Sequence, residues 1–407
     1  MKEKNIRAWL IVATSFVILM IVFAACISCM GIYLKPVCEE FGIQRTAYTL
    51  TTTIQALALL VTSMIAGKLL DKYNVKTLMA LGVVACAACM FLYSIASSIS
   101  VFYAAGVLMG IGIAFSCNIP INILINSWFD SSRKGFALGI AFVGSGVGAM
   151  VLNPFLTSII TDIGWRMAYR TSGILMLAIA LPLVLIIVKR NEASKDESNQ
   201  VEGCLLHEEN YFTLSDAMKK PAFWMVFIGY IIVTFASLAL VNHSVPFLTD
   251  TGFSPEKAAM IVSVASAVII GGKIVAGVMY SKIGTFKATI IETILTTACV
   301  LTFCLSGLTQ SMIFIIMYVI LYGIGIPIAT ISMTLVINVM FPKCDFGAIM
   351  GFLSMSTGLA GMLQIAVSMS YDALGSYYPA WIGTCILCII ALVLFIASVR
   401  PQYKRVQ

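Results

Sequence analysis

Charged residues are so widely spaced along this chain that they divide it into long apolar stretches, and this spacing restricts the fold more than any other feature. Seven stretches of 18 to 29 residues contain no Asp, Glu, Lys or Arg. A membrane-spanning helix needs about 20 mostly apolar residues, so each stretch is predicted to cross a membrane once. The bounding charges are Arg7 and Lys35, Arg45 and Lys68, Lys134 and Asp162, Arg170 and Lys189, Lys220 and Asp250, Asp345 and Asp372, and Asp372 and Arg400.

Two further uncharged stretches are long enough for two helices each. Residues 77–129 are interrupted by Ser-Ser-Ile-Ser at 97–100, and residues 293–342 by Thr-Gln-Ser at 309–311. Residues 257–282 make one more span, which carries a single internal charge, Lys273. The sequence therefore predicts an all-α membrane protein with twelve transmembrane helices.

The overall composition excludes several classes of protein. The chain has 407 residues, 60% apolar and 11% charged, whereas soluble domains are about 25% charged and rarely expose large apolar patches. The net charge of +7 is scattered rather than gathered on one face, so no nucleic-acid partner is expected. Three Cys pairs spaced i, i+3 lie in apolar runs without a nearby His or carboxylate, and there is no nucleotide-binding loop. We expect no metal, no cofactor and no enzyme activity.

The distribution of basic residues predicts the orientation of the chain. If both termini are cytoplasmic, 19 Lys and Arg residues lie on the cytoplasmic side and 5 lie outside. Cytoplasmic loops carry an excess of Lys and Arg, so both termini are predicted to be cytoplasmic. The protein is expected to be a multi-pass protein of the cell membrane.

One long hydrophilic stretch divides the chain into halves. Residues 189–220 are rich in Glu, Ser, Asn and Lys and are predicted to form a cytoplasmic linker between residues 1–188 and 221–407. Gly135, Gly139 and Gly146 recur 212 residues later as glycines, and Ile125-Asn126 recurs at the same offset. The pattern predicts two six-helix bundles related by a pseudo-twofold axis, with a substrate site at the membrane midplane.

Residues 67–76 resemble the loop signature of the major facilitator superfamily, and the resemblance covers the whole chain. Residues 31–42, 128–148, 164–169 and 246–254 resemble the monocarboxylate and oxalate–formate carriers in particular. The resemblance implies a secondary transporter that functions as a monomer. It also implies a conformational latch at Gly67, Asp71 and Lys72, in which Asp71 faces the positive end of a neighbouring helix.

Lys273 is the principal candidate for substrate binding. It is separated by nine residues from Lys282, which places it roughly 13 Å inside the cytoplasmic end of its helix, and an ionisable residue inside a span indicates function. The related carriers have an arginine at what resembles this position, where it binds the substrate carboxylate. Lysine keeps the charge but lacks the bidentate geometry. Snorkelling or gating is the alternative role.

Three departures from the related carriers narrow the prediction. Thr357 stands where oxalate carriers have a second basic residue, which disfavours oxalate. Ser28 and Ile269 stand where proton-coupled monocarboxylate carriers have a lysine and an aspartate, so coupling by that mechanism is not expected. Glu292, the other charge near a span interior, is expected close to the cytoplasmic edge.

Polar residues inside spans usually face the bundle interior, which supplies secondary candidates for the substrate cavity. Many such residues only bridge helices, and His243 is a candidate to carry a proton. The set is Tyr33, Thr52, Gln55, Asn118, Asn122, Asn242, His243, Thr330 and Thr334. The glycines between Gly135 and Gly148 and the prolines in the spans are expected to serve packing and bending.

The sequence leaves three hypotheses for function. The first is a carrier of a small organic anion, expected to be a monocarboxylate, that works by rocking of the two halves. The second is a carrier or exporter of a neutral or cationic solute, in which Lys273 is structural. The third is a membrane sensor with the same fold that binds without transport.

Overall fold

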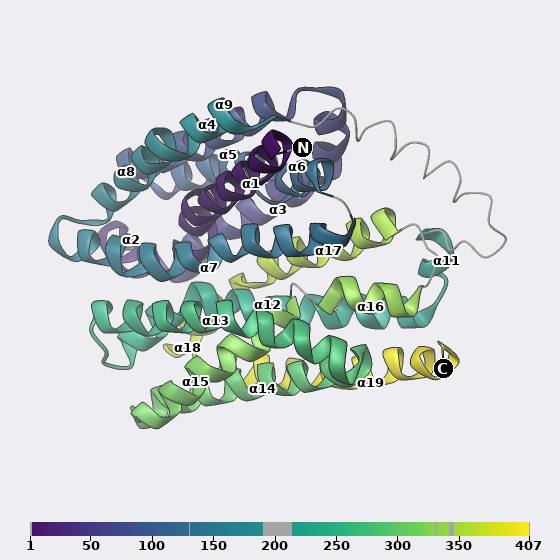
Figure 1. Cartoon of the computed structure of the whole chain (residues 1–407). Helices are drawn as coiled ribbons and strands as arrows, with labels where there is room; N and C mark the ends of the chain where they lie inside the picture. The colour runs from purple at the N-terminus through teal and green to yellow at the C-terminus, as the bar shows by residue number, and fades with distance from the viewer. Residues whose placement is uncertain (1, 130, 190–213, 330–331, 342–345, 407) are drawn as a thin grey trace. The chain divides into compact units, whose positions relative to one another are not determined.

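The computed structural model describes residues 2–129, 131–189, 214–329, 332–341 and 346–406, and these residues form helices and no strand (Figure 1). Twelve helical segments within them are long and apolar enough to cross a membrane. The predicted count of twelve spans is therefore confirmed, including the divisions after Ile95 and Thr309.

The chain divides into two compact units, which we call unit 1 (Met1–Glu202) and unit 2 (Gly203–Gln407). Most of the linker predicted at residues 189–220 lies outside the described residues. Its described end contains the short helix α11 (Leu214–Met218), which precedes the seventh span.

Unit 1 contains the first six spans, drawn in purple to teal in Figure 1. Its first span passes from α-helix to π-helix and back, and its fourth and sixth spans are also built from more than one segment. The elements are α1 (Lys2–Ile18), the π-helix η1 (Leu19–Ser28), α2 (Met30–Phe41), α3 (Arg45–Lys72), α4 (Val75–Ile95), α5 (Ile99–Ser116), α6 (Asn118–Trp128), α7 (Ser131–Asp162), α8 (Trp165–Leu175), the π-helix η2 (Met176–Ala180) and α9 (Leu181–Ile187).

Glycines allow α7 to cross the first span at close range. A Cβ added at Gly144 would overlap the carbonyl oxygen of Phe16, and one at Gly148 would overlap that of Met20. Small residues at such crossings are typical of membrane helix pairs, so the predicted packing role of these two glycines is confirmed. For Gly139 the prediction is wrong, because a Cβ there would meet no described atom within 4 Å.

Two helix ends differ from the predicted boundaries. The first span continues past Lys35 to Phe41, and the sixth begins at Trp165 rather than after Arg170. Arg166 and Glu40 lie in these two extensions, and the Arg166 guanidinium forms an ion pair with Glu40 at the end of α2. It also donates a hydrogen bond to the carbonyl of Ala96 (3.0 Å). Charged residues that pair with one another can lie within the ends of a span. Boundaries predicted from the positions of charged residues are then too short.

Unit 2 contains the remaining six spans. Its tenth span passes through a short 3₁₀ turn, and its eleventh is divided at a single residue, Gln364. The elements after α11 are α12 (Pro221–Asp250), α13 (Pro255–Ile283), α14 (Thr285–Thr309), α15 (Met312–Gly325), the 3₁₀ turn η3 (Ile326–Ala329), α16 (Ser332–Met340), α17 (Phe346–Leu363), α18 (Ile365–Leu374) and α19 (Tyr378–Val406).

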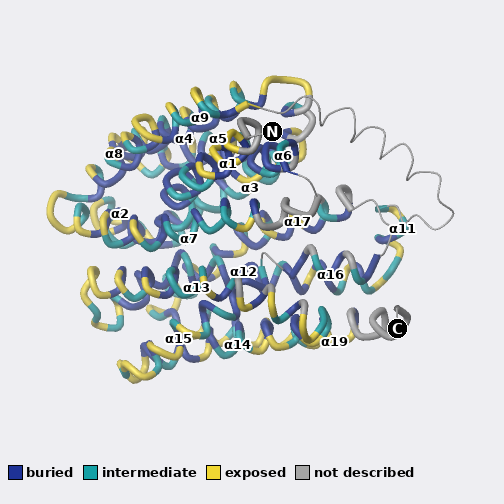
Figure 2. Tube along the Cα trace, viewed as in Figure 1, coloured by how far each residue is buried: buried dark blue, intermediate teal, exposed yellow. Residues whose placement is uncertain are grey.

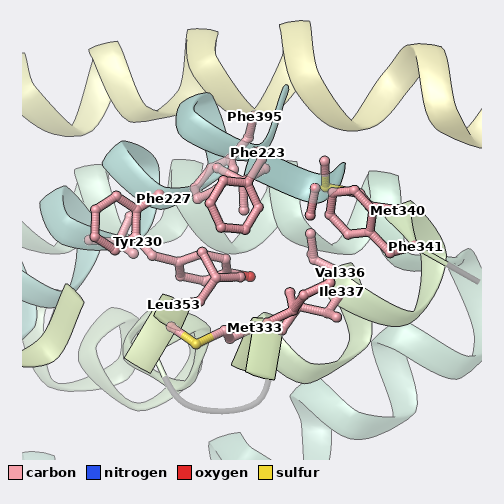
Figure 3. Packing of buried hydrophobic residues seen from close by; sticks show 14 of the residues in the cluster. Phe223, Phe227, Tyr230, Met333, Val336, Ile337, Met340, Phe341, Leu353 and Phe395 are labelled. Carbon is pink, nitrogen blue, oxygen red and sulfur yellow. The ribbon is translucent and has the colours of Figure 1, made fainter. Parts of the chain in front are cut away.

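An apolar cluster holds α12, α16, α17 and α19 together within unit 2. Phe223 and Tyr230 of α12 lie completely buried in it, beside Phe395 of α19 (Figure 3). Val336 of α16 and Leu353 of α17 close the cluster from their own helices. Packing of this kind, together with close backbone contact, drives helix association in membranes.

The faces of α14 are arranged as a membrane helix requires, with polar groups inside and large apolar groups outside. Buried and exposed residues alternate along the long helices (Figure 2). The exposed side chains of α14 include Ile291, Ile294, Leu301 and Leu308, and the buried ones include Thr289, Glu292, Thr293, Thr296 and Ser306. A water-soluble helix has the opposite arrangement, so this face pattern indicates contact with lipid.

Candidate functional site

The middle of the first span is π-helical, and Gln55 of α3 contacts it. π-Helical segments are rare and are found frequently at functional sites. Nε2 of Gln55 donates a hydrogen bond to the carbonyl of Cys26 in η1 (3.1 Å). Its Oε1 is buried and has no hydrogen-bond partner among the described residues. Gln55 therefore retains one free acceptor next to an irregular helix.

The fourth span is broken in its middle, between α5 and α6. Cys117 has φ −107° and ψ −113°, outside the helical range, and helix resumes at Asn118. Asn118 is exposed although it lies inside the span, and its carbonyl accepts a hydrogen bond from Nδ2 of Asn122 (2.8 Å). An exposed amide at this depth is unfavourable against lipid, which favours a polar, solvated environment for Asn118.

The irregular parts of the fourth and tenth spans contain the same tripeptide. Ile-Pro-Ile occurs at 119–121, at the start of α6, and again at 326–328, in η3. Broken helices at corresponding positions of two repeats mark the binding region of many transporters. Thr330, a predicted site residue next to this second break, lies outside the described residues.

Lys273 lies within the eighth span, α13, and is half-buried. The preceding residue faces α15, because a Cβ on Gly272 would overlap the backbone carbonyl of Gly323. Among the described residues, the structure shows no ion pair or hydrogen bond made by the Lys273 ammonium group. A cation inside a span that makes no ion pair or hydrogen bond with the described residues is available to bind an anion.

Asn242 and His243 of α12 are both buried within unit 2. Nδ2 of Asn242 donates to Oε1 of Gln364 (2.6 Å), the single residue between α17 and α18. The His243 ring lies 6.0 Å from the ring of Tyr377. These contacts tie α12 to its neighbours, which is the bridging role that the sequence leaves open for polar residues.

Tyr33 lies in an aromatic cluster of unit 1. Its ring stacks on that of Tyr169 at 3.8 Å, and the Tyr169 hydroxyl lies 3.1 Å from the hydroxyl of Tyr48. Tyr48 in turn donates to the carbonyl of Met30 (3.1 Å). Thr52, another candidate, is half-buried and donates to the carbonyl of Thr49 in its own helix (2.8 Å).

The signature segment is helical where the sequence suggests a loop. Residues 67–72 form the last turns of α3, beyond the end of the second span at Ala66. Lys72 is exposed, and its ammonium lies 5.6 Å from the Tyr73 ring centre. The surroundings of the Gly67 and Asp71 side chains are not among those that the structure describes, so the latch remains a prediction.

Glu292 is an ionisable group whose burial the sequence does not predict. It is completely buried in α14, as the eighth residue of the ninth span, and its position close to the cytoplasmic edge stays a prediction. The Tyr280 hydroxyl donates to its Oε2 (2.8 Å). The signal in the sequence is the row of threonines at Thr289, Thr293 and Thr296, whose spacing places them on one helix face with Glu292.

The described residues contain no group of three or more His, Cys, Asp or Glu side chains arranged to hold a metal ion. The Cys26, Cys86 and Cys388 thiols are buried and free, and each belongs to one of the three cysteine pairs. No residue set for a cofactor emerges from this part of the chain.

Comparison with known proteins identifies the chain's relatives. The family model described as Major Facilitator Superfamily matches residues 16–365. An uncharacterized MFS-type transporter, YcxA of Bacillus subtilis (strain 168), is 25% identical over 62% of this chain and 60% of its own. The oxalate:formate antiporter of Oxalobacter formigenes is 25% identical over 63% of this chain and 59% of its own. The matches thus span about three fifths of these two relatives.

More distant relatives and solved structures extend the comparison. Human monocarboxylate transporter 12 is 26% identical over 46% of this chain and 40% of its own. A bacterial homologue of the human lysosomal transporter Spinster superimposes with a TM-score of 0.75 at 17% identity, covering 96% of both chains. A D-xylose–proton symporter superimposes with a TM-score of 0.76 at 11% identity, covering 96% of this chain and 97% of its own. At these identities the structures support the fold alone.

Proposed function

The chain belongs to the Major Facilitator Superfamily, and from that premise we propose that it is a secondary transporter of a small organic anion, expected to be a monocarboxylate. The oxalate:formate antiporter and monocarboxylate transporter 12 among its relatives support this substrate class. Transport proceeds by alternating access, with the two six-helix halves rocking about a midplane site. The protein acts as a monomer in the cell membrane, with both termini cytoplasmic.

The observation that carries the proposal is Lys273. It lies inside the eighth span with no ion pair or hydrogen bond to another described residue. An unpaired cation at this depth is costly unless a counter-ion reaches it. A substrate carboxylate supplies that counter-ion, and lysine holds it as a point charge.

The broken fourth and tenth spans support the transport mechanism. Irregular backbone at membrane depth is tolerated where it is buried in protein or lines a water-filled cavity. Asn118 and Asn122 lie at the first break, and Gln55 presents a free acceptor beside η1. We assign these three side chains to the substrate pathway and Gly67, Asp71 and Lys72 to the latch.

Uptake into proteoliposomes tests the proposal. Purified protein is assayed with labelled lactate, formate, acetate, pyruvate and oxalate, comparing wild type with Lys273→Gln. We expect saturable uptake of at least one monocarboxylate, reduced at least tenfold in Lys273→Gln and partly restored in Lys273→Arg. Lys257→Gln is the matched control, because Lys257 is an exposed lysine at the start of the same helix.

Three outcomes contradict the proposal. Wild-type protein that transports none of the anions, but transports a neutral or cationic solute, supports the second hypothesis and makes Lys273 structural. Saturable binding of a solute without net flux supports a sensor. Normal anion uptake by folded Lys273→Gln removes the binding role of Lys273.

A further inference from the structure

Glu292 is a buried carboxyl group that substrate binding at Lys273 does not use. It lies in the ninth span, and its side chain is completely buried. Among the described residues, its carboxyl group has one hydrogen-bond partner, the Tyr280 hydroxyl, which donates to Oε2 (2.8 Å). The other oxygen, Oε1, is buried and has no partner among the described residues.

The groups that face Glu292 do not neutralise a negative charge. Tyr280 of α13 and Tyr230 of α12 are the titratable groups near it. Among the other elements packed against α14, α16 contributes the neutral Ser332, whose hydroxyl lies beside that of Tyr230. Tyr322 of α15 and the thiol of Cys388 of α19 lie near Cys299, two turns along α14 from Glu292. Lys282 and Lys287, at the end of the α13–α14 hairpin, are exposed.

No described Lys or Arg side chain forms an ion pair with Glu292. A buried carboxylate with a single hydrogen-bond donor and no cation is strongly unfavourable. The neutral acid is the form that this environment accommodates. A metal ion is a poor alternative, since the described residues hold no cluster of metal-ligating side chains.

The position of Glu292 connects it to the break in the tenth span. Thr296, one turn further along α14, donates both to the carbonyl of Glu292 (2.9 Å) and to that of Gly325 (3.0 Å), where α15 ends. On the other side of the break, the hydroxyl of Ser332 lies 2.9 Å from that of Tyr230. Tyr230 is part of the apolar cluster of unit 2 (Figure 3), so its hydroxyl lies at the edge of a dry core.

We propose that Glu292 is a proton-binding site that couples proton movement to transport, which rests on the proposed transporter function. In the arrangement described here Oε1 carries the proton. When the break in the tenth span rearranges, water reaches Oε1, the O–H bond breaks and the proton passes to that water. The carboxylate that remains keeps the hydrogen bond from Tyr280.

Unit 1 has no counterpart of Glu292 at the corresponding position. At the repeat offset of 210 residues, Leu70 and Gly82 occupy the positions that correspond to Tyr280 and Glu292. A Cβ at Gly82 would lie 2.8 Å from the carbonyl oxygen of Gly112. Unit 1 therefore has neither an ionisable group nor room for one at this point.

Infrared spectroscopy of the purified protein in lipid tests the site without a substrate. We expect wild type to show the carbonyl stretch of a protonated carboxyl group that responds reversibly to pH. The band is lost in Glu292→Gln and shifts in Tyr280→Phe, which removes the one hydrogen-bond donor. Glu39→Gln, a change at an exposed glutamate at the end of α2, leaves the band unchanged. A band that persists in Glu292→Gln overturns the proposal.

A transport assay tests the coupling. Proteoliposomes with an internal pH indicator receive labelled lactate, with and without a pH gradient. Wild type is expected to accumulate lactate on the gradient and to move protons with it. Glu292→Gln, which can still accept the Tyr280 hydrogen bond, loses accumulation but retains exchange of labelled for unlabelled lactate.

The infrared and transport assays together show which proposal fails, the proton site at Glu292 or the transport of an organic anion. Accumulation on the gradient by Glu292→Gln overturns the role of Glu292 and leaves the transporter intact. Wild type that moves no lactate, although it shows a pH-responsive band that depends on Glu292, counts against the anion proposal and keeps the proton site. Absence of such a band from wild type overturns the proton site whatever is transported.

Discussion

Individual polar residues inside the spans fall into two groups according to whether their hydrogen bonds are complete. Asn242 and Gln364 bond to each other across two helices of unit 2. Gln55 uses its donor on the carbonyl of Cys26 and leaves its acceptor free. Lys273 leaves its ammonium free of described partners. Groups of the second kind are those that a ligand can complete, since buried polar groups are otherwise paired.

Replacing Gln55 by Met tests this distinction. We expect KM for lactate, whose hydroxyl can donate to the free Oε1, to rise about five- to tenfold, because a hydrogen bond contributes about 1 kcal/mol, while the maximal rate changes little. Initial uptake rates over a range of concentrations give both constants. Asn153→Leu is the control, since Asn153 is equally buried but donates only to Ala149 in its own helix. Equal effects of the two changes would show that Gln55 only supports the fold.

The sequence could identify which residues are polar inside a span, but not which of them are paired. Lys273 and Gln55 stand out because each interrupts an apolar run. Tyr33 satisfies the same criterion, yet it is stacked on Tyr169, 136 positions further along the chain. For Glu292 the sequence predicts a place close to the cytoplasmic edge, but not that its side chain is completely buried. Its burial depends on Tyr280, which lies on another helix.

At the scale of helices, glycines and breaks determine which elements approach each other. The crossing of α7 with the first span depends on Gly144 and Gly148, because any side chain there overlaps backbone. The sequence predicted glycine-mediated packing correctly at these positions. It could not exclude Gly139, since spacing alone does not show that the opposite surface of the helix is open.

Substitution of Gly148 by Leu is therefore expected to destabilise unit 1 by about 1–3 kcal/mol, the usual effect of overpacking. Thermal unfolding of the purified protein in detergent, followed by fluorescence, measures the change. Gly139→Leu is the matched control on the same helix, with an expected change of less than about 0.5 kcal/mol. Equal loss of stability in both variants would mean that α7 does not cross the first span as described.

The number of membrane-spanning helices can be predicted from the sequence, but the π-helical segment in the first span cannot. The count of spans follows from the length of the apolar runs, which is a property of the local sequence. The break at Cys117 has a signal in Pro120, because a proline disturbs the helical turn that precedes it. The π-helix η1 has no comparable signal, because it arises where neighbouring side chains supply replacement hydrogen bonds. The Cys26 carbonyl, which accepts from Gln55, is one such case.

At the scale of the whole molecule, each unit contains its own apolar core and its own six spans. We expect residues 1–202 and 203–407, coexpressed as separate chains, to restore transport to at least about a tenth of the intact level, since helices that are stable in lipid associate after insertion. Uptake in vesicles from cells with both chains, compared with cells with either one, measures this. Two chains that accumulate in the membrane without transport would show that the covalent connection is required.

The hydrogen bond between Tyr280 and Glu292 has a consequence for biosynthesis. The two residues are twelve positions apart, on either side of the turn at Gly284. A charged residue at the centre of a helix opposes membrane insertion by roughly 2.5–3.5 kcal/mol. Because Tyr280 leaves the ribosome first, α14 reaches the translocon with a hydrogen-bond donor for its carboxyl group already in place. The α13–α14 hairpin can therefore enter the bilayer as one piece during translation, before α16 has been synthesised.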